Sequence, residues 1–103
     1  MELTSSQLAD LDRDGYLLLE NRFSAKEVEL INARLPSLFA ENHPGNIVEQ
    51  SSGAVRTTMG LHLRDELFAR VARHPRLIGP ALQILREPVY VQQIKVNVKA
   101  AFS

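Results

Sequence analysis

Apolar residues recur at helical spacing in the second quarter of the chain. Val28, Ile31, Leu35 and Leu38 follow one another at intervals of three or four residues. This spacing predicts an amphipathic helix, because such residues share one helix face. Ser24 and Glu27 form the capping-box signal that starts a helix. Pro36 lies inside the pattern and predicts a kink or break near Arg34.

The same reading predicts three further helices. Thr4 and Gln7 form another capping box, and Gly15 marks the end of that first helix. Apolar residues at helical spacing predict a helix over residues 63–74, which Pro75 closes. Pro75 can also begin the next helix, over residues 75–85.

Strands are predicted in three places. Residues 16–19 form a short apolar run, typical of a buried strand. Residues 47–58 predict a pair of short strands hinged at Ser51, Ser52 and Gly53. Residues 89–99 alternate between apolar and polar side chains and predict a final strand. Helices come first and the sheet follows, so the expected fold class is α+β.

The predicted final strand has a polar face. Successive side chains point to opposite sides of a strand, so Gln93, Lys95, Asn97 and Lys99 fall on one side. Such a face can belong to a half-solvated antiparallel strand, or it can look into a ligand cavity. Residue types alone leave both interpretations open.

Composition narrows the class of protein. A chain of 103 residues allows one domain at most, and we expect residues 1–103 to form a single region. Twelve acidic and twelve basic side chains cancel, which argues against a nucleic-acid partner. No apolar run reaches the roughly 18 residues that span a bilayer, so no membrane partner is expected. The N-terminus resembles no signal peptide, and we expect a cytoplasmic location.

One motif resembles a calcium loop. Asp10, Asp12, Asp14 and Gly15 have the spacing that begins an EF-hand. The loop fails at its end, because position 12 is Asn21 where a bidentate glutamate is needed. A helix that ends at glycine explains the motif better, and an EF-hand-like module stays a distant alternative.

The histidines do not form a metal site. The chain has no cysteine, and no pair among His43, His62 and His74 has the HxH or HxxxH spacing of metal ligands. We expect His74 at a helix C-terminus and Asp65 in the first turn of a helix, where its charge suits the dipole. No metal-ligating or catalytic residue is therefore assigned within this chain.

Three segments resemble the phytanoyl-CoA dioxygenase family, and within it the ectoine-hydroxylase-like members. They are residues 55–62 (VRTTMGLH), 68–85 (FARVARHPRLIGPALQIL) and 88–99 (PVYVQQIKVNVK). The opening Asp14 to Leu19, followed by a helix, is also usual there. The resemblance covers essentially the whole chain, but only the N-terminal part of a typical member.

The resemblance implies a non-haem Fe(II) enzyme that uses 2-oxoglutarate. Its fold would be a double-stranded β-helix (jelly roll) with helices outside, and the barrel would be incomplete in this chain. The family's iron ligands, a His-x-Asp pair and a distal His, would lie beyond Lys99, so the chain alone is expected to be inactive. Asn97 and Lys99 would lie near 2-oxoglutarate, Gln93 would face the substrate, and Met59 would line the cavity where ectoine hydroxylase has an aromatic residue.

Two hypotheses remain for the function. The first is the N-terminal region of a dioxygenase that oxidises a small metabolite, most simply by hydroxylation. The second is a stand-alone α+β domain that binds a ligand or partner without catalysis. In the first case we expect the chain to self-associate or to associate with the missing C-terminal part, because the last strand would expose an unpaired edge.

Overall fold

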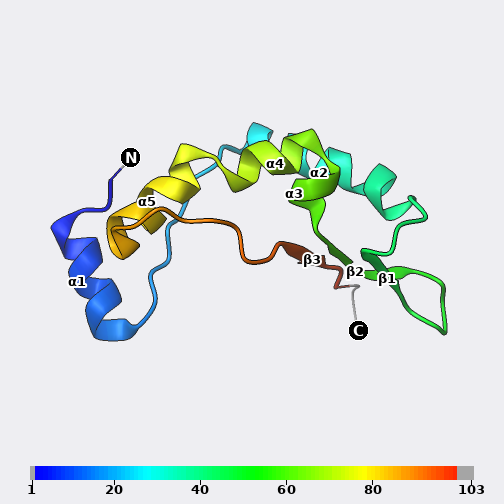
Figure 1. Ribbon diagram of the computed structural model, residues 1–103, viewed down its shortest axis with the longest axis horizontal. Helices are drawn as coiled ribbons and strands as arrows, with labels where there is room; N and C mark the ends of the chain where they lie inside the picture. Colours follow the sequence, from blue (N-terminus) through cyan, green and yellow to red (C-terminus); the bar gives the residue numbers. More distant parts are fainter. Residues whose placement is uncertain (1, 100–103) are drawn as a thin grey trace.

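The computed structural model describes residues 2–99, which form five helices and three strands. The helices are α1 (Ser5–Asp14), α2 (Ala25–Phe39), α3 (Leu61–Arg64), α4 (Glu66–Ala72) and α5 (Pro75–Leu85). The strands are β1 (Asn46–Val48), β2 (Val55–Met59) and β3 (Lys95–Asn97). In Figure 1 the sheet lies below the end of the helical layer that carries α2 and α3, and α1 lies at the opposite end.

The two predicted capping boxes are confirmed. Thr4 accepts a hydrogen bond from the backbone N–H of Gln7, and the Gln7 side chain accepts one from the backbone N–H of Thr4. Ser24 and Glu27 repeat this exchange at the start of α2. Gly15 ends α1 in the left-handed conformation, with φ of 80°. These local signals therefore fix where the first two helices begin.

Of the kink or break predicted at Pro36, the break is wrong, because α2 runs without interruption from Ala25 to Phe39. Proline removes one helical hydrogen bond and normally kinks a helix. Here the last turn carries Leu38, which is fully buried, and Leu35, which packs against the same core. Burial of these leucines offsets the lost bond and keeps the turn helical.

The single helix predicted over residues 63–74 is divided into α3 and α4 at Asp65. Asp65 has an extended backbone and caps α4, its carboxylate accepting from the N–H of Phe68. It also accepts a 2.7 Å hydrogen bond from Arg34 of α2, which holds it at this corner. The prediction for His74 is also wrong, since it is the N-cap of α5 and accepts from the N–H of Arg76.

Two of the strand predictions need correction. Residues 16–19 form no strand, and Tyr16 and Leu18 are 70% and 73% exposed, so they find no sheet to join. The final strand is paired only over Lys95–Asn97, and residues 88–94 are irregular. The pair predicted over residues 47–58 is confirmed as β1 and β2, which run antiparallel on either side of the turn at residues 50–52.

The sheet is antiparallel, with strand order β1–β2–β3. Its register places Thr58 opposite Asn46 and Val96, and places Thr57 opposite Ile47 and Asn97. Val96 packs with Leu38, Leu61 and Phe68 of the helices, and Thr58 is fully buried. One face of the sheet therefore lies against α2, α3 and α4.

The chain buries little of its surface. Its radius of gyration is 16.3 Å, whereas a compact domain of this length has one of about 13 Å. It exposes 7967 Å², against roughly 5,800 Å² for a compact protein of this mass. Large apolar side chains on α5 and the segment after it stay exposed, among them Leu85 at 61% and Tyr90 at 86%. The small core fastens the sheet to the helices and leaves much apolar surface uncovered.

Candidate functional site

The face of the sheet turned away from the helices carries two of the residues singled out from the sequence, Met59 and Asn97. Thr57 and Met59 of β2 lie opposite Asn97 and Lys95 of β3, so these four residues share one side. We name them the open face. Lys95 and Asn97 are exposed, and Thr57 and Met59 are half-buried. Met59 and Asn97, which the family resemblance assigned to a ligand cavity, thus lie on the same surface.

The two cross-strand pairs of the open face bring their side chains into close approach. Backbone hydrogen bonds join Gly60 to Ile94 at 2.9 Å and Val98 to Arg56 at 2.8 Å. The hydrogen-bonded positions therefore fall on even-numbered residues of both strands. Thr57 with Asn97, and Met59 with Lys95, lie at the intervening positions, where opposing Cα atoms are closest. The hydroxyl of Thr57 accordingly donates to Oδ1 of Asn97, at 3.1 Å.

Gln93 and Lys99 flank this surface. Gln93 lies in the irregular segment before β3, and Lys99 follows two residues after it; both side chains are exposed. The sequence placed Gln93, Asn97 and Lys99 on one face of a strand over residues 89–99. The structure shows strand geometry for Lys95–Asn97 only, so the roles of Gln93 and Lys99 stay predictions. The amide of Asn97 on the open face and the exposed ammonium of Lys99 beside it can donate hydrogen bonds to an anionic ligand.

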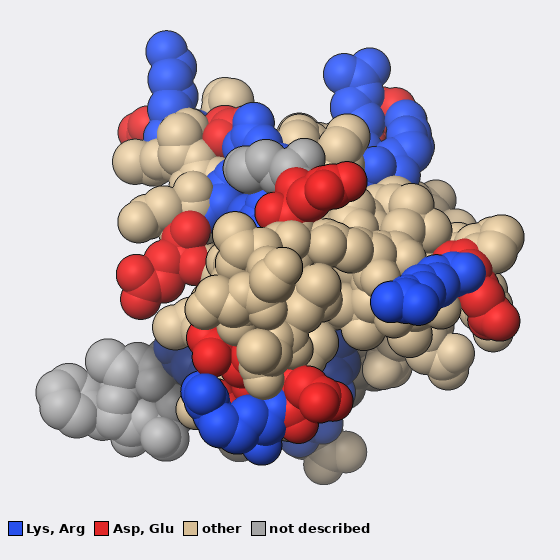
Figure 2. All heavy atoms as spheres, turned by 90° about the vertical axis from the view of Figure 1, so that its left-hand side faces the viewer, with Lys and Arg blue, Asp and Glu red and all other residues tan. Residues whose placement is uncertain are grey.

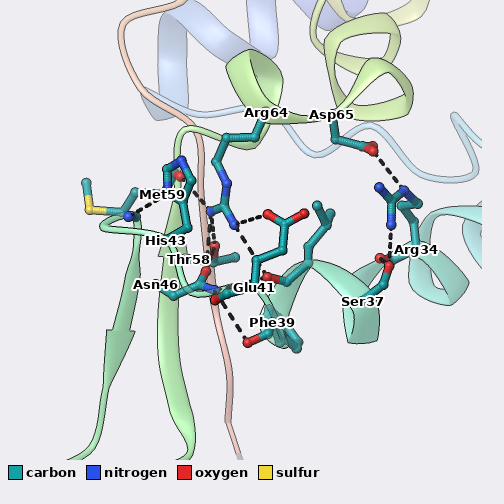
Figure 3. Close-up of polar contacts among 12 residues, drawn as sticks. Arg34, Ser37, Phe39, Glu41, His43, Asn46, Thr58, Met59, Arg64 and Asp65 are labelled. Carbon is teal, nitrogen blue, oxygen red and sulfur yellow. Dashed lines mark hydrogen bonds and ion pairs between the residues drawn. The ribbon is translucent and has the colours of Figure 1, made fainter.

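The opposite face of β2 holds a buried polar network around Arg64, whose side chain is 7% exposed. Its guanidinium donates to the hydroxyl of Thr58 at 2.7 Å and to the carboxylate of Glu41 at 2.9 Å. Thr58 in turn donates to Oδ1 of Asn46. Figure 3 shows these side chains converging between the end of α2 and the two strands.

This network also satisfies the end of α2. The last carbonyls of a helix have no partner within the helix. The amide nitrogen of Asn46 donates to the carbonyls of Leu38 and Glu41, at 3.0 and 2.9 Å, and Arg64 also reaches the carbonyl of Leu38, at 3.4 Å. The network therefore connects helix, strand and α3, and it fixes the position of β2. The sequence did not reveal this role of Arg64, because the hydrogen-bond partners of its guanidinium are 5 to 26 residues away in the chain.

A second charged cluster joins the first turns of α2 and α5. Arg76 donates to the carboxylate of Glu27 at 2.6 Å and to the carbonyl of Arg22 at 2.9 Å. Its guanidinium also lies 5.1 Å from the ring centre of Phe23. The hydrogen bond from Arg76, followed by that from the backbone of Ser24, lowers the pKa of Glu27 to about 2.

Residues 2–99 contain no group of three His, Cys, Asp or Glu side chains placed to hold a metal ion. The aspartates of the calcium-like motif lie in or at the end of α1, where Arg13 pairs with Asp10 at 3.1 Å and Asp14 at 2.9 Å. Figure 2 shows acidic and basic side chains interspersed on this end of the molecule. No helix among the described residues is both long and apolar enough to cross a membrane.

Comparison with known proteins identifies the family. The model of the phytanoyl-CoA dioxygenase (PhyH) family matches residues 11–102. The chain belongs to the phytanoyl-CoA dioxygenase family. This confirms the resemblance found in the segments 55–62, 68–85 and 88–99.

Proteins similar to this chain include a hydroxylase and a dioxygenase. L-proline trans-4-hydroxylase of Streptomyces griseoviridis is 43% identical over 89 residues, which cover 86% of this chain and 33% of that protein. Ectoine dioxygenase of Stutzerimonas stutzeri is 41% identical over 96 residues, covering 89% of this chain and 32% of the relative. The chain therefore spans about a third of the length of these relatives.

Solved structures agree with the family assignment. EctD from S. alaskensis with bound Fe matches with a TM-score of 0.85 and 31% identity, over 92% of this chain and 35% of that one. EctD with 2-oxoglutarate and 5-hydroxyectoine matches with a TM-score of 0.83 over the same shares. The helices and small antiparallel sheet described above thus correspond to part of an oxygenase of this family.

Proposed function

We propose that this chain forms the N-terminal part of an Fe(II)- and 2-oxoglutarate-dependent dioxygenase that hydroxylates a small metabolite. Membership of the phytanoyl-CoA dioxygenase family supports this, as does the likeness to EctD structures that contain Fe or 2-oxoglutarate. The observation that carries the proposal is the shared surface of Met59 and Asn97, which register places on the open face. We also propose a cytoplasmic location for this protein, as expected from the sequence.

Asn97 and Lys99 are proposed to bind 2-oxoglutarate. A dicarboxylate needs hydrogen-bond donors, and the Asn97 amide and the Lys99 ammonium supply them. Charge-assisted bonds from an ammonium to a carboxylate are shorter and stronger than neutral ones. Both side chains are exposed, so a ligand can reach them.

Gln93 and Met59 are proposed to contact the substrate. Gln93 offers both an amide donor and an acceptor, which suits a polar metabolite. Met59 offers a flexible thioether that adapts to an irregular ligand. Ectoine hydroxylase has an aromatic residue where this chain has Met59, so the substrate is proposed to differ from ectoine. Bound iron would supply the oxidising chemistry with dioxygen as the oxidant and 2-oxoglutarate as the cosubstrate that is oxidised with the substrate. We assign the iron ligands to residues beyond Lys99.

Binding of 2-oxoglutarate to the complete protein that carries this chain tests the proposal without knowledge of the substrate. We expect calorimetric titration of the iron-loaded, oxygen-free protein to show one site for 2-oxoglutarate. Metabolites such as L-proline and ectoine are then screened for coupled 2-oxoglutarate consumption and a hydroxylated product. Absence of 2-oxoglutarate binding would refute the proposal and favour the non-catalytic binding domain.

A further inference from the structure

We propose that Thr57 is a positioning residue for 2-oxoglutarate, and that its hydroxyl fixes the side-chain amide of Asn97 so that the amide nitrogen faces the cosubstrate. This inference rests on the proposed function, which places Asn97 beside 2-oxoglutarate. The observation behind it is the hydrogen bond from Oγ1 of Thr57 to Oδ1 of Asn97, 3.1 Å long, across two strands and 40 residues.

The backbone hydrogen bonds between β2 and β3 determine that Thr57 lies opposite Asn97. Hydrogen bonds at Gly60–Ile94 and Val98–Arg56 leave Thr57 and Asn97 at a position without backbone bonds between them. Directly opposed side chains at such positions have Cβ atoms about 4.5–5.5 Å apart, within reach of a hydroxyl–amide bond. The contact therefore follows from strand register and does not depend on a loop conformation.

The direction of the hydrogen bond decides what Asn97 can offer a ligand. Its amide oxygen accepts from Thr57, and its Nδ2 makes no hydrogen bond to any other described residue. Both N–H groups are thus left to donate, which is what a carboxylate requires. Without the hydroxyl of Thr57, the side-chain amide of Asn97 can turn over and present its oxygen to the ligand. That oxygen and the carboxylate oxygen of the ligand are both acceptors, so they would repel each other.

Threonine is well suited to this task. Its branched β-carbon restricts χ1, so the hydroxyl keeps one direction along the strand. The strand itself is held from its other face, where the neighbouring Thr58 accepts from Arg64. The two threonines therefore have different partners: Thr58 contacts the buried network, and Thr57 contacts Asn97 on the open face.

The test measures the dissociation constant of 2-oxoglutarate, by calorimetry on the iron-loaded, oxygen-free complete protein. Thr57→Val keeps the shape and removes the hydroxyl, and we expect binding to weaken about three- to tenfold, as for loss of one hydrogen bond. Thr57→Ser restores the donor and should bind within about twofold of wild type. The midpoint of thermal unfolding should change little in either variant, because Thr57 is only half-buried.

Thr58→Val is the matched control on the same strand. It removes a buried hydroxyl that partners Arg64 and Asn46. We expect a clear fall in the thermal midpoint and an unchanged affinity for 2-oxoglutarate in the folded protein. If both valine variants lowered stability equally and left affinity unchanged, Thr57 would be structural and the inference would be overturned.

Asn97→Ala separates this inference from the proposed function. If Asn97→Ala binds 2-oxoglutarate like wild type, the assignment of Asn97 fails and the role of Thr57 fails with it. If Asn97→Ala binds weakly while Thr57→Val binds normally, only the positioning role is overturned. When Thr57→Val is combined with Asn97→Ala, the dissociation constant of 2-oxoglutarate should be the same as in Asn97→Ala alone. A full additional loss there would show that Thr57 acts independently of Asn97 and would overturn the inference.

Discussion

A guanidinium nitrogen of Arg76 lies 2.6 Å from a carboxylate oxygen of Glu27, which joins the first turn of α5 to the first turn of α2. The same carboxylate closes the capping box of α2 by accepting from the backbone N–H of Ser24. Glu27 therefore serves the start of its own helix and the contact between two helices at once.

This pair predicts a pH dependence of stability. The pKa of Glu27 is lowered from 4.5 to about 2, chiefly by Arg76. The folded state thus holds its proton less tightly than the unfolded state, so the stabilisation is complete above about pH 4.5 and is lost as pH falls toward 2. Between these values, the thermal midpoint of the complete protein should fall more steeply than that of Glu27→Gln.

The control for this measurement is Glu29→Gln, an exposed carboxylate on the same helix. Its midpoint should follow the wild-type curve through the acidic range. Parallel curves for wild type and Glu27→Gln would show that the ion pair does not contribute to stability.

Removal of Arg64 should destabilise the fold. Arg64→Met removes the donor to the hydroxyl of Thr58 and to the carboxylate of Glu41, while the carbonyl of Leu38 still accepts from Asn46. The loss of the donor to a fully buried hydroxyl predicts a loss of about 1–3 kcal/mol in the free energy of unfolding, measured by denaturant titration. Arg70→Ala, which breaks an exposed pair with Glu66, should cost under about 1 kcal/mol. Similar losses in the two variants would contradict the central role of Arg64.

Gly45 should not tolerate a side chain. A Cβ at this position would lie 2.6 Å from the carbonyl oxygen of Met59 and 3.0 Å from a nitrogen of Arg64. Gly45→Ala must therefore displace β2 or the guanidinium, at a cost of about 1–3 kcal/mol. At Gly15, with φ of 80°, a Cβ meets no atom within 4 Å, so Gly15→Ala shows the cost of backbone strain alone. The prediction fails if Gly45→Ala unfolds at the wild-type denaturant concentration.

Lys99→Ala should weaken the use of 2-oxoglutarate by the complete enzyme. A charge-assisted hydrogen bond of roughly 1.5–3 kcal/mol predicts about a tenfold or greater rise in the apparent constant for 2-oxoglutarate. Lys99→Arg should restore little of the affinity for 2-oxoglutarate, because the planar guanidinium of arginine presents its donors in directions that differ from those of an ammonium. Lys95→Ala, on the open face but with no assigned role, is the control. Wild-type kinetics in Lys99→Ala would refute the assignment of Lys99.

The 103-residue chain produced alone should be poorly stable or should self-associate. It exposes 7967 Å² of surface, including the side chains of Leu85 and Tyr90. Within residues 2–99, β3 is an edge strand that pairs with β2 along one edge only. Exposed apolar patches and unpaired strand edges both promote association. Sedimentation velocity should therefore detect oligomers. A monomer with a sharp thermal transition would instead support a stand-alone domain.

Local signals in the sequence predicted the helix ends well. Ser24 with Glu27, and Pro75 at the start of α5, act within a few residues, so the sequence alone reveals them. Predictions failed where distant partners decide the structure. Asp65 divides a regular apolar pattern because Arg34, 31 residues away, holds its carboxylate at the corner. Residues 16–19 have the composition of a strand, but no strand of the described chain lies beside them.

The site was predictable to a similar extent. Alternation along residues 95–97 placed Lys95 and Asn97 on one side from the sequence alone. The facing residue Thr57 was missed, because alternation says nothing about which strand lies opposite. Only the pairing of β2 with β3 reveals that partner. Family resemblance supplied the proposed roles of Asn97 and Lys99, which periodicity could not.

The adjacent threonines of β2 make the strand sensitive to sliding. A shift of one residue in a β-ladder turns every side chain to the opposite face. Such a slip would carry Thr57 into the buried network and would expose Thr58, while Met59 would turn toward the core. A slip in the direction that puts Met59 in the place of Thr58 would offer Arg64 no hydroxyl oxygen there, so that register loses a buried hydrogen bond. The buried contact between Arg64 and Thr58 therefore favours the strand register that places Thr57 and Met59 on the open face.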